Sequence, residues 1–332
     1  MRAIGLLGAT GFTGRLTAAE FAARGIDVRL GARSRSRLAK VDATDASERV
    51  TVDATNSRDL AGFMAGLDVV ISTIGPFTSL GRPVVDAAVA AGVHYIDSTG
   101  EPGFMAELYD EFRGATSAVV PACGFDYLPG DCAAFVAVSM LDAGVDSVRV
   151  GYVLNDMRPT RGTAMSALEA ALATPSPRLR RTEIEGRTAI GLPWGEELMV
   201  PRWAPGAAVD CAITAPRVIS AIAPFAGPLT GPMLRLGAPV LRRLVMRMPE
   251  GPSDDARQRA TCRVVVTASG AGQSVTTSVD VSDVYGFTAL ALVECAFRVE
   301  GGGAMSPAQA FDAGDLLDAL RGPMLWWTRP TS

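Results

Sequence analysis

The chain has 332 residues, and domains of about 150 residues would divide a chain of that length into two. Hydrophobic residues make up 48% of it and charged residues 20%, a composition that can build a sizeable core and excludes a disordered chain. The formal net charge is −4. The sequence therefore has no excess of basic residues to neutralise a phosphate backbone, and nucleic acid is not an expected partner.

Residue types that are almost missing limit the chemistry. Lys40 is the single lysine and His94 the single histidine, so a lysine–tyrosine pair, a histidine triad or a two-histidine metal site would have to use them. The five cysteines form no CxxC pair and no zinc-ligand spacing, so no metal is expected. Scattered thiols suit a reducing cytoplasm. The sequence has neither the roughly 20 consecutive apolar residues of a membrane-spanning helix nor a signal peptide, so we expect a cytoplasmic protein.

The first half of the chain alternates between two patterns. Short apolar runs predict strands, and apolar residues at helical spacing predict helices between them. The expected strands are 3–7, 27–33, 49–53, 68–74, 94–97 and 118–121, and the expected helices are 15–24, 34–40, 57–65, 80–91 and 103–114. This alternation predicts an α/β fold with a Rossmann-type, doubly wound parallel sheet.

Three glycines follow the first expected strand at GxxGxxG spacing. Gly8 allows a tight turn, Gly11 lets phosphates approach the backbone, and Gly14 lets the following helix pack against the sheet. Backbone N–H groups at such a helix N-terminus can hold a pyrophosphate. The residues expected to bind a dinucleotide here are Gly8, Thr10, Gly11, Phe12, Thr13 and Gly14.

The end of the second expected strand indicates which dinucleotide binds. An NAD site has an Asp or Glu about 20 residues after the glycines, which accepts hydrogen bonds from the ribose. The segment 28–41 has no carboxylate and instead carries Arg33, Ser34 and Arg37. A cluster of this kind suits a 2′-phosphate, so the sequence predicts NADP(H) rather than NAD(H).

The ends of the later strands should lie at the same edge of the sheet. Asp53 closes the third strand, where adenine contacts are common, and the turn at Gly75–Pro76 breaks the fourth beside the expected nicotinamide ribose. The further candidates for cofactor contact are Asp53, Ser72, Thr73, Gly75, Pro76, Phe77, Cys123 and Gly124. Ordinary turn chemistry, or small apolar packing for Cys123, is the alternative for each of them.

Several of these motifs together resemble the saccharopine dehydrogenase-like oxidoreductases, in the branch that includes the trans-acting enoyl reductases. The resemblance is dense over 1–135 and continues only in islands at 161–166 and 283–289. It is carried by the segments 8–14, 31–34, 71–77, 94–101 and 122–131. It implies a Rossmann domain joined to a smaller α+β domain, NADP(H) as cofactor, and reduction of a carbon–carbon double bond on a carrier-bound acyl or polyketide chain.

The second half changes pattern after about residue 146. Strands are expected near 148–154, 178–190, 207–214, 261–268 and 274–281, with a helix at 163–173. Consecutive strands without long helices between them favour an antiparallel sheet. We therefore expect an NADP-binding domain at 1–135, onto which helices at about 286–330 pack back, and an α+β substrate or dimerisation domain at 136–285.

Residues 216–248 combine prolines and methionines with arginines beside apolar residues at helical spacing. One hypothesis is a lid over a small-molecule or carrier-bound acyl substrate, or a peripheral contact with a membrane surface. The alternative is a surface helix that packs on the sheet domain or on the partner subunit of a homodimer.

The catalytic residues cannot be those of the short-chain dehydrogenases, because none of the five tyrosines has a lysine four residues later. A bound nicotinamide would supply the hydride, so the chain must supply a proton and hydrogen bonds to the substrate oxygen. Tyr127 is the preferred proton donor because it follows the last parallel strand, and Asp126 or water is the alternative. Backbone amides or the hydroxyls of Tyr127 and Thr163 would hold the oxygen.

Three functions stay open at this point. The first is the NADP(H)-dependent enoyl reductase that the resemblance implies. The second is an imine or carbonyl reductase of specialised metabolism with the same cofactor site. The third is a nucleotide-binding or membrane-associated scaffold that has lost turnover.

Overall fold

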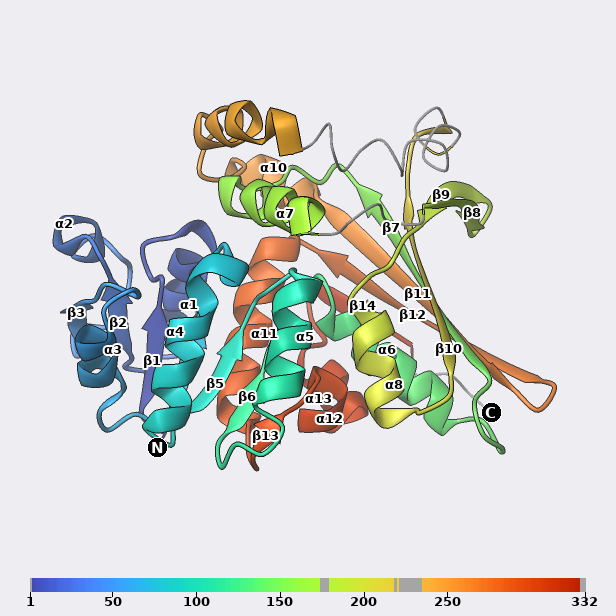
Figure 1. Ribbon diagram of the computed structural model, residues 1–332, viewed down its shortest axis with the longest axis horizontal. Helices are drawn as coiled ribbons and strands as arrows, with labels where there is room; N and C mark the ends of the chain where they lie inside the picture. The colour runs from blue at the N-terminus through green and yellow to red at the C-terminus, as the bar shows by residue number, and fades with distance from the viewer. Residues whose placement is uncertain (1, 174–178, 218–219, 221–234, 329–332) are drawn as a thin grey trace. The chain divides into compact units, whose positions relative to one another are not determined.

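The computed structural model describes residues 2–328 apart from 174–178, 218–219 and 221–234 (Figure 1). The chain forms two compact units, of which unit 1 is Met1–Asp126 with Tyr285–Asp312 and unit 2 is Tyr127–Val284 with Ala313–Ser332. The domain limits expected from the sequence remain predictions, because a compact unit within one chain is not thereby a part that folds alone.

Unit 1 is built on a seven-stranded sheet in which all neighbouring strands run parallel. The strand order is β13-β6-β5-β4-β1-β2-β3. Its strands are β1 (Ile4–Leu7), β2 (Arg29–Ala32), β3 (Arg49–Thr51), β4 (Val69–Ser72), β5 (His94–Asp97), β6 (Ala118–Val120) and β13 (Gly303–Ala304). The predicted doubly wound parallel sheet is confirmed.

Helices cover both faces of this sheet, and the central strands β1 and β4 are buried along their whole length. The helices are α1 (Phe12–Ala23), α2 (Arg35–Leu38), α3 (Ser57–Met64), α4 (Phe77–Ala90), α5 (Pro102–Glu111), α11 (Val284–Arg298) and α12 (Pro307–Ala310). Helix α4 packs against α3 and α5. Helix α1 contacts α11 through the rings of Phe21 and Phe297 and the ion pair of Arg24 with Glu294. The late segment 285–312 is thus part of the first unit.

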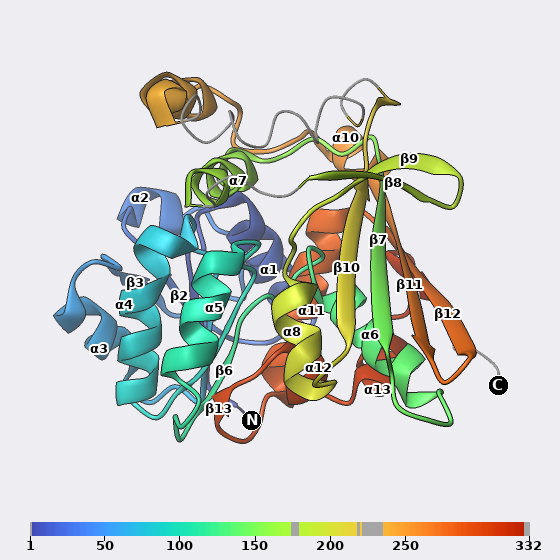
Figure 2. The ribbon, with the colours of Figure 1, turned by 45° about the vertical axis from the view of Figure 1, so that its right-hand side comes forward.

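Unit 2 contains a second seven-stranded sheet, in the order β14-β12-β11-β7-β10-β9-β8. Figure 2 shows its long strands β12, β11, β7 and β10 side by side. Its strands are β7 (Ser147–Asn155), β8 (Arg180–Ile184), β9 (Arg187–Gly191), β10 (Ala208–Thr214), β11 (Thr261–Gly270), β12 (Gln273–Ser282) and β14 (Leu325–Trp327). The sheet is mixed: the expected antiparallel pairing holds for its other neighbouring strands, but it is wrong for β7 and β10, which pair in parallel. The connection from β7 to β10 contains α7 (Arg161–Ala173) and α8 (Glu196–Trp203), which supply the crossover that parallel neighbours need.

One face of the second sheet packs on α6 (Leu128–Ser139), which contacts β11 and β12 and also α8 and α13 (Ala313–Ala319). Strand β11 accordingly alternates between buried and half-buried residues. The short helix α10 (Asp254–Arg259) leads into β11. Among the described residues, no helix has the length and hydropathy needed to cross a membrane.

Candidate functional site

The glycine turn after β1 is tied to the end of β2. The backbone N–H groups of Gly8 and Ala9 donate to the Gly31 carbonyl at 3.0 and 3.2 Å, and Gly11 N–H donates to the Gly8 carbonyl at 2.8 Å. Gly8 has a φ of +84°, a conformation that L side chains rarely adopt. The end of the neighbouring strand therefore holds the turn in place.

This turn leaves the N-terminus of α1 open. Gly11 is the N-cap, and no side chain caps the helix, so the first N–H groups have no partner within the helix. A Cβ atom on Gly11 would come within 4 Å of only the Gly8 carbonyl oxygen among non-neighbouring atoms, at 3.2 Å, whereas one on Gly14 would lie 2.2 Å from that oxygen. The helix thus meets the turn after β1 at Gly14 while its end stays accessible beside Gly11, and a pyrophosphate fits that arrangement.

Two arginines stand at the same turn. Arg15 and Arg37 each donate from a guanidinium to the carbonyl oxygen of Thr10 at 2.9 Å. Ser34 caps α2 by accepting a hydrogen bond from Arg37 N–H at 3.3 Å, and Arg33 is exposed. The β2–α2 turn therefore gathers positive charge beside the glycines, with no carboxylate in its sequence.

Asp53 lies two residues after β3, and its carboxylate turns back on its own loop. It accepts hydrogen bonds from the backbone N–H and the hydroxyl of Thr55 at 2.9 and 2.8 Å. These two bonds, with a smaller contribution from the charge of Arg33, lower the pKa of Asp53 below its usual value. An adenine contact by Asp53 stays a prediction.

The residues after β4 lie directly beside the glycine turn. Thr73 donates to the Leu7 carbonyl from its backbone N–H and from its hydroxyl, both at 3.0 Å. A Cβ on Gly8 would lie 2.6 Å from the Thr73 hydroxyl oxygen. Ser72 is buried at the end of β4, and Gly75 and Pro76 lead into α4, with Pro76 as its N-cap. The structure thus brings the predicted candidates after β1 and β4 together.

Glu101 lies in the turn that follows β5 and is 1% exposed. Its carboxylate accepts hydrogen bonds from the N–H groups of Phe77 and Thr78, both at 2.8 Å, and from the Thr78 hydroxyl at 2.5 Å. The N-terminus of α4 therefore already has an anionic partner, unlike that of α1. Phe77, a predicted cofactor contact, uses its amide in this cap.

Asp97 fixes the loop that follows β6. Its buried carboxylate accepts hydrogen bonds from the Tyr95 hydroxyl at 2.7 Å and from the N–H groups of Thr99 and Ala122 at 2.9 Å each. Burial raises its pKa to about 7 although these donors oppose the shift. Cys123, which is fully buried, donates its N–H to the Asp97 carbonyl at 2.7 Å. Cofactor contacts by Cys123 and Gly124 stay predictions.

No role was expected for Tyr285, which brings α11 to the glycine turn. Its ring packs edge-on against Phe12 at 5.3 Å and against Phe125 at 6.3 Å between centroids. One turn later, the Thr288 hydroxyl accepts a hydrogen bond from Phe125 N–H at 3.2 Å. The only signal in the sequence was the isolated island at 283–289.

The three catalytic candidates lie in different surroundings. Asp126 is half-buried at the end of the first segment of unit 1, and burial raises its pKa to about 7. Tyr127 belongs to unit 2 and is fully buried, with its ring 5.9 Å from that of Trp194. The Thr163 hydroxyl, also in unit 2, lies 2.8 Å from that of Thr160. Asp126 is thus the candidate that shares a unit with the glycine turn.

The segment 216–248 lies in part outside the described residues, namely at 218–219 and 221–234. Residues 235–246 are helical and expose Leu236 (84%), Val240, Leu244 and Met246. A lid, a membrane contact and a subunit interface all stay predictions for it. In the part of the chain that the structure describes, no group of three or more His, Cys, Asp or Glu residues is placed to hold a metal ion.

Residues 8–113 match a family model described as NAD(P)H-binding. A provisionally named trans-acting enoyl reductase of Mycobacterium tuberculosis is 41% identical over 141 residues, which are 39% of this chain and 34% of the relative. A trans-acting enoyl reductase of Mycobacterium bovis is 39% identical over 138 residues, which are 38% of this chain and 33% of the relative. These matches span about a third of the relatives' own length.

A solved structure extends the comparison to the whole chain. The saccharopine dehydrogenase (L-Glu forming) of Saccharomyces cerevisiae matches with a TM-score of 0.64 and 14% identity, covering 100% of both chains. At that identity the likeness shows the fold alone. The resemblance predicted from the motifs is confirmed, and the family model indicates a nicotinamide dinucleotide without distinguishing NADP(H) from NAD(H).

Proposed function

We propose that this chain is an NADP(H)-dependent reductase that transfers hydride to the activated double bond of an enoyl thioester. The observation that carries the proposal is the uncapped N-terminus of α1 behind the Gly8–Gly14 turn. Arg15 and Arg37, both bound to the Thr10 carbonyl, add positive charge for a pyrophosphate. Two of the relatives that match this chain in sequence are named trans-acting enoyl reductases, and these names support the reaction class.

The preference for NADP(H) rests on the β2–α2 turn. An exposed Arg33 and the absence of a carboxylate between Val28 and Val41 suit a 2′-phosphate and not a pair of ribose hydroxyls. Titration should give a lower Kd for NADPH than for NADH, and Arg33→Gln should raise the NADPH Kd about tenfold while leaving that of NADH unchanged. Arg113→Gln, at the end of α5, is the matched control. A wild-type Kd that is lower for NADH would contradict the assignment.

The proton donor is proposed to be Asp126. A bound nicotinamide supplies the hydride, and a carboxyl group whose pKa lies near 7 is half protonated at neutral pH, as a general acid should be. Tyr127 is fully buried against Trp194, which leaves it the second choice. Within unit 1, the candidate hydrogen-bond donors to the thioester oxygen are the backbone amides near Gly75 and Gly124. A role for the hydroxyl of Thr163, which belongs to unit 2, stays a prediction.

The deciding experiment is NADPH oxidation across a panel of substrates. Crotonyl-type thioesters should be reduced, whereas keto and imine substrates of similar size should not. Oxidation with imines or ketones alone would transfer the proposal to the imine or carbonyl reductase. Cofactor binding without oxidation across the whole panel would favour a nucleotide-binding scaffold.

A further inference from the structure

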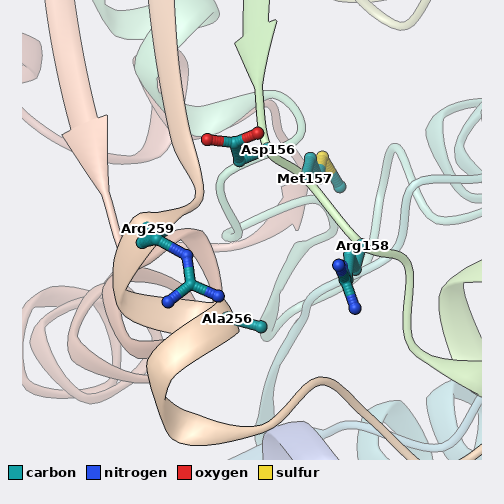
Figure 3. Close-up of a pocket in the computed structure, with 5 residues that line it drawn as sticks. All are labelled: Asp156, Met157, Arg158, Ala256 and Arg259. Carbon is teal, nitrogen blue, oxygen red and sulfur yellow. The ribbon is translucent and has the colours of Figure 1, made fainter.

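A second candidate site lies wholly within unit 2. It is a pocket of about 330 Å³ lined by Asp156, Met157, Arg158, Ala256 and Arg259. Figure 3 shows the guanidinium groups of Arg158 and Arg259 on two sides of it, with Ala256 between them and the Asp156 carboxylate at the top. Its volume is at the lower end of the range of about 300–1,000 Å³ typical of small-ligand sites.

The walls of this pocket are held by the register of the sheet. Strands β7 and β11 are antiparallel neighbours, and Asn155 at the end of β7 pairs with Thr261 at the start of β11. The segment 156–158 leaves one strand where α10 enters the other, so this register places both arginines at the same end of the sheet. Asp156 has a φ of +49°, which turns the chain sharply at this point.

The charges of α10 leave one arginine available. Arg257 is bound by Asp283 at 3.0 Å and by Asp254 at 3.6 Å, so these carboxylates are already engaged. Arg259 is exposed, and among the residues that the structure describes it has no ion pair. A guanidinium in a concave site, with a second one on the other side of the pocket, suits an anionic oxygen ligand such as a phosphate.

We propose that this pocket binds the phosphate of a phosphopantetheine arm, and this inference rests on the proposed enoyl thioester substrate. Arg158 and Arg259 would hold the phosphate oxygens, and Asp156 would accept a hydrogen bond from a hydroxyl or amide N–H of the arm. Met157 and Ala256 complete the lining of the pocket. The same arm is carried by acyl coenzyme A and by acyl carrier proteins, so the chemistry is shared by two sources.

The first test measures binding alone. Calorimetry should show 4′-phosphopantetheine binding about tenfold more tightly than pantetheine, which lacks the phosphate, and Arg259→Gln or Arg158→Gln should abolish the difference. Arg259→Lys should keep part of it, since the charge remains. Arg181→Gln, an exposed arginine of β8, removes the same charge from the same unit and should change nothing. Equal affinity for the two ligands would overturn the inference.

The second test separates the pocket from the reaction. Arg259→Gln should raise KM for crotonyl thioesters of coenzyme A or of a carrier protein about tenfold, without changing kcat, and should leave the N-acetylcysteamine thioester unaffected. Whichever phosphopantetheine substrate has the lower KM identifies the source. An equal increase in KM for all three thioesters would contradict phosphopantetheine binding in the pocket without contradicting the proposed reductase. If the protein bound phosphopantetheine through these arginines but reduced no thioester, the pocket would be supported and the proposed reductase would be contradicted.

Discussion

The contact at Gly14 is the tightest backbone approach in the glycine turn. An added Cβ would lie 2.2 Å from the Gly8 carbonyl oxygen and 2.9 Å from the Ala9 Cα, and backbone atoms cannot rotate away as a side chain can. Gly14→Ala must therefore shift α1 away from the turn, at a cost of about 1–3 kcal/mol, and should abolish dinucleotide binding. Urea denaturation and NADPH titration measure the two effects.

The matched control for this prediction is Gly62→Ala. Gly62 lies inside α3, is exposed, and an added Cβ would have no neighbour within 4 Å. Alanine there should stabilise the helix by about 0.5–1 kcal/mol. If Gly14→Ala kept both stability and NADPH affinity, the proposed close approach of helix and strand would be wrong.

Asp126 has a testable titration. Because only the protonated carboxyl can donate, kcat should be constant below a pH of about 7 and fall as the pH rises through that pKa. Asp126→Asn should lower kcat about a hundredfold and remove this limb of the pH profile. Tyr127→Phe should keep the profile. If Asp126→Asn kept the wild-type pH profile and Tyr127→Phe lost it, the proton donor would be Tyr127 and not Asp126.

Some of these residue positions could be read from the sequence and others could not. Gly8 and Gly14 are predictable because a strand–turn–helix connection needs glycines at positions that lie close together in the sequence, so their spacing is visible there. Glu101 is different, since it caps a helix that begins 24 residues earlier, and a lone glutamate in a turn indicates no partner. The contact of Tyr285 with Phe12 joins distant parts of the chain, and only the tertiary fold reveals it.

At the scale of elements, predictability follows the strength of the local pattern. Strand β5 was expected at 94–97 and spans His94–Asp97. The expected strand at 178–190 is the hairpin of β8 and β9. Glu185 and Gly186, which both have a positive φ, form its turn. The sequence did not show this turn because the apolar pattern continues through it. Helix α8 was missed because Gly195 precedes it and Pro201 lies inside it. Strand β13 has two residues, too few for any periodicity.

Helix α8 carries a buried acid that should make unit 2 sensitive to pH. Glu196 is fully buried, accepts hydrogen bonds from the Tyr152 hydroxyl and, at 3.7 Å, from the Cys211 thiol, and has a pKa raised to about 8 by burial. Between about 4.5 and 8 the unfolded chain loses this proton while the folded chain keeps it, so stability should fall as the pH rises through that window.

Glu196→Gln removes the ionisable group and should flatten this part of the stability curve. All four tryptophans, Trp194, Trp203, Trp326 and Trp327, lie in unit 2, so tryptophan fluorescence during urea denaturation at several pH values reports on that unit. Glu183→Gln, an exposed carboxylate of β8, is the control. A slope that survived in Glu196→Gln would assign the pH dependence to other groups.

At the scale of the whole molecule, the division of the chain separates cofactor binding from the second sheet. Every residue predicted to touch the dinucleotide lies in unit 1, while the proposed phosphopantetheine pocket lies in unit 2. Unit 1 is also completed by the late segment 285–312, whose Tyr285 packs on Phe12 of the glycine turn. A ligand at that turn should therefore stabilise two stretches that are far apart in sequence.

Hydrogen exchange can follow this effect peptide by peptide. NADPH at a hundred times its Kd adds about 2.7 kcal/mol to the stability of the unit that binds it, so amides of β1, α1 and β2 should exchange more slowly. Helix α11 should gain protection with them, because it packs on α1 and on the turn. Peptides of β8 and β9 should not change, and Gly14→Ala should abolish the protection. Protection that appeared first in β8 and β9 would place the dinucleotide in unit 2 and contradict the proposed site.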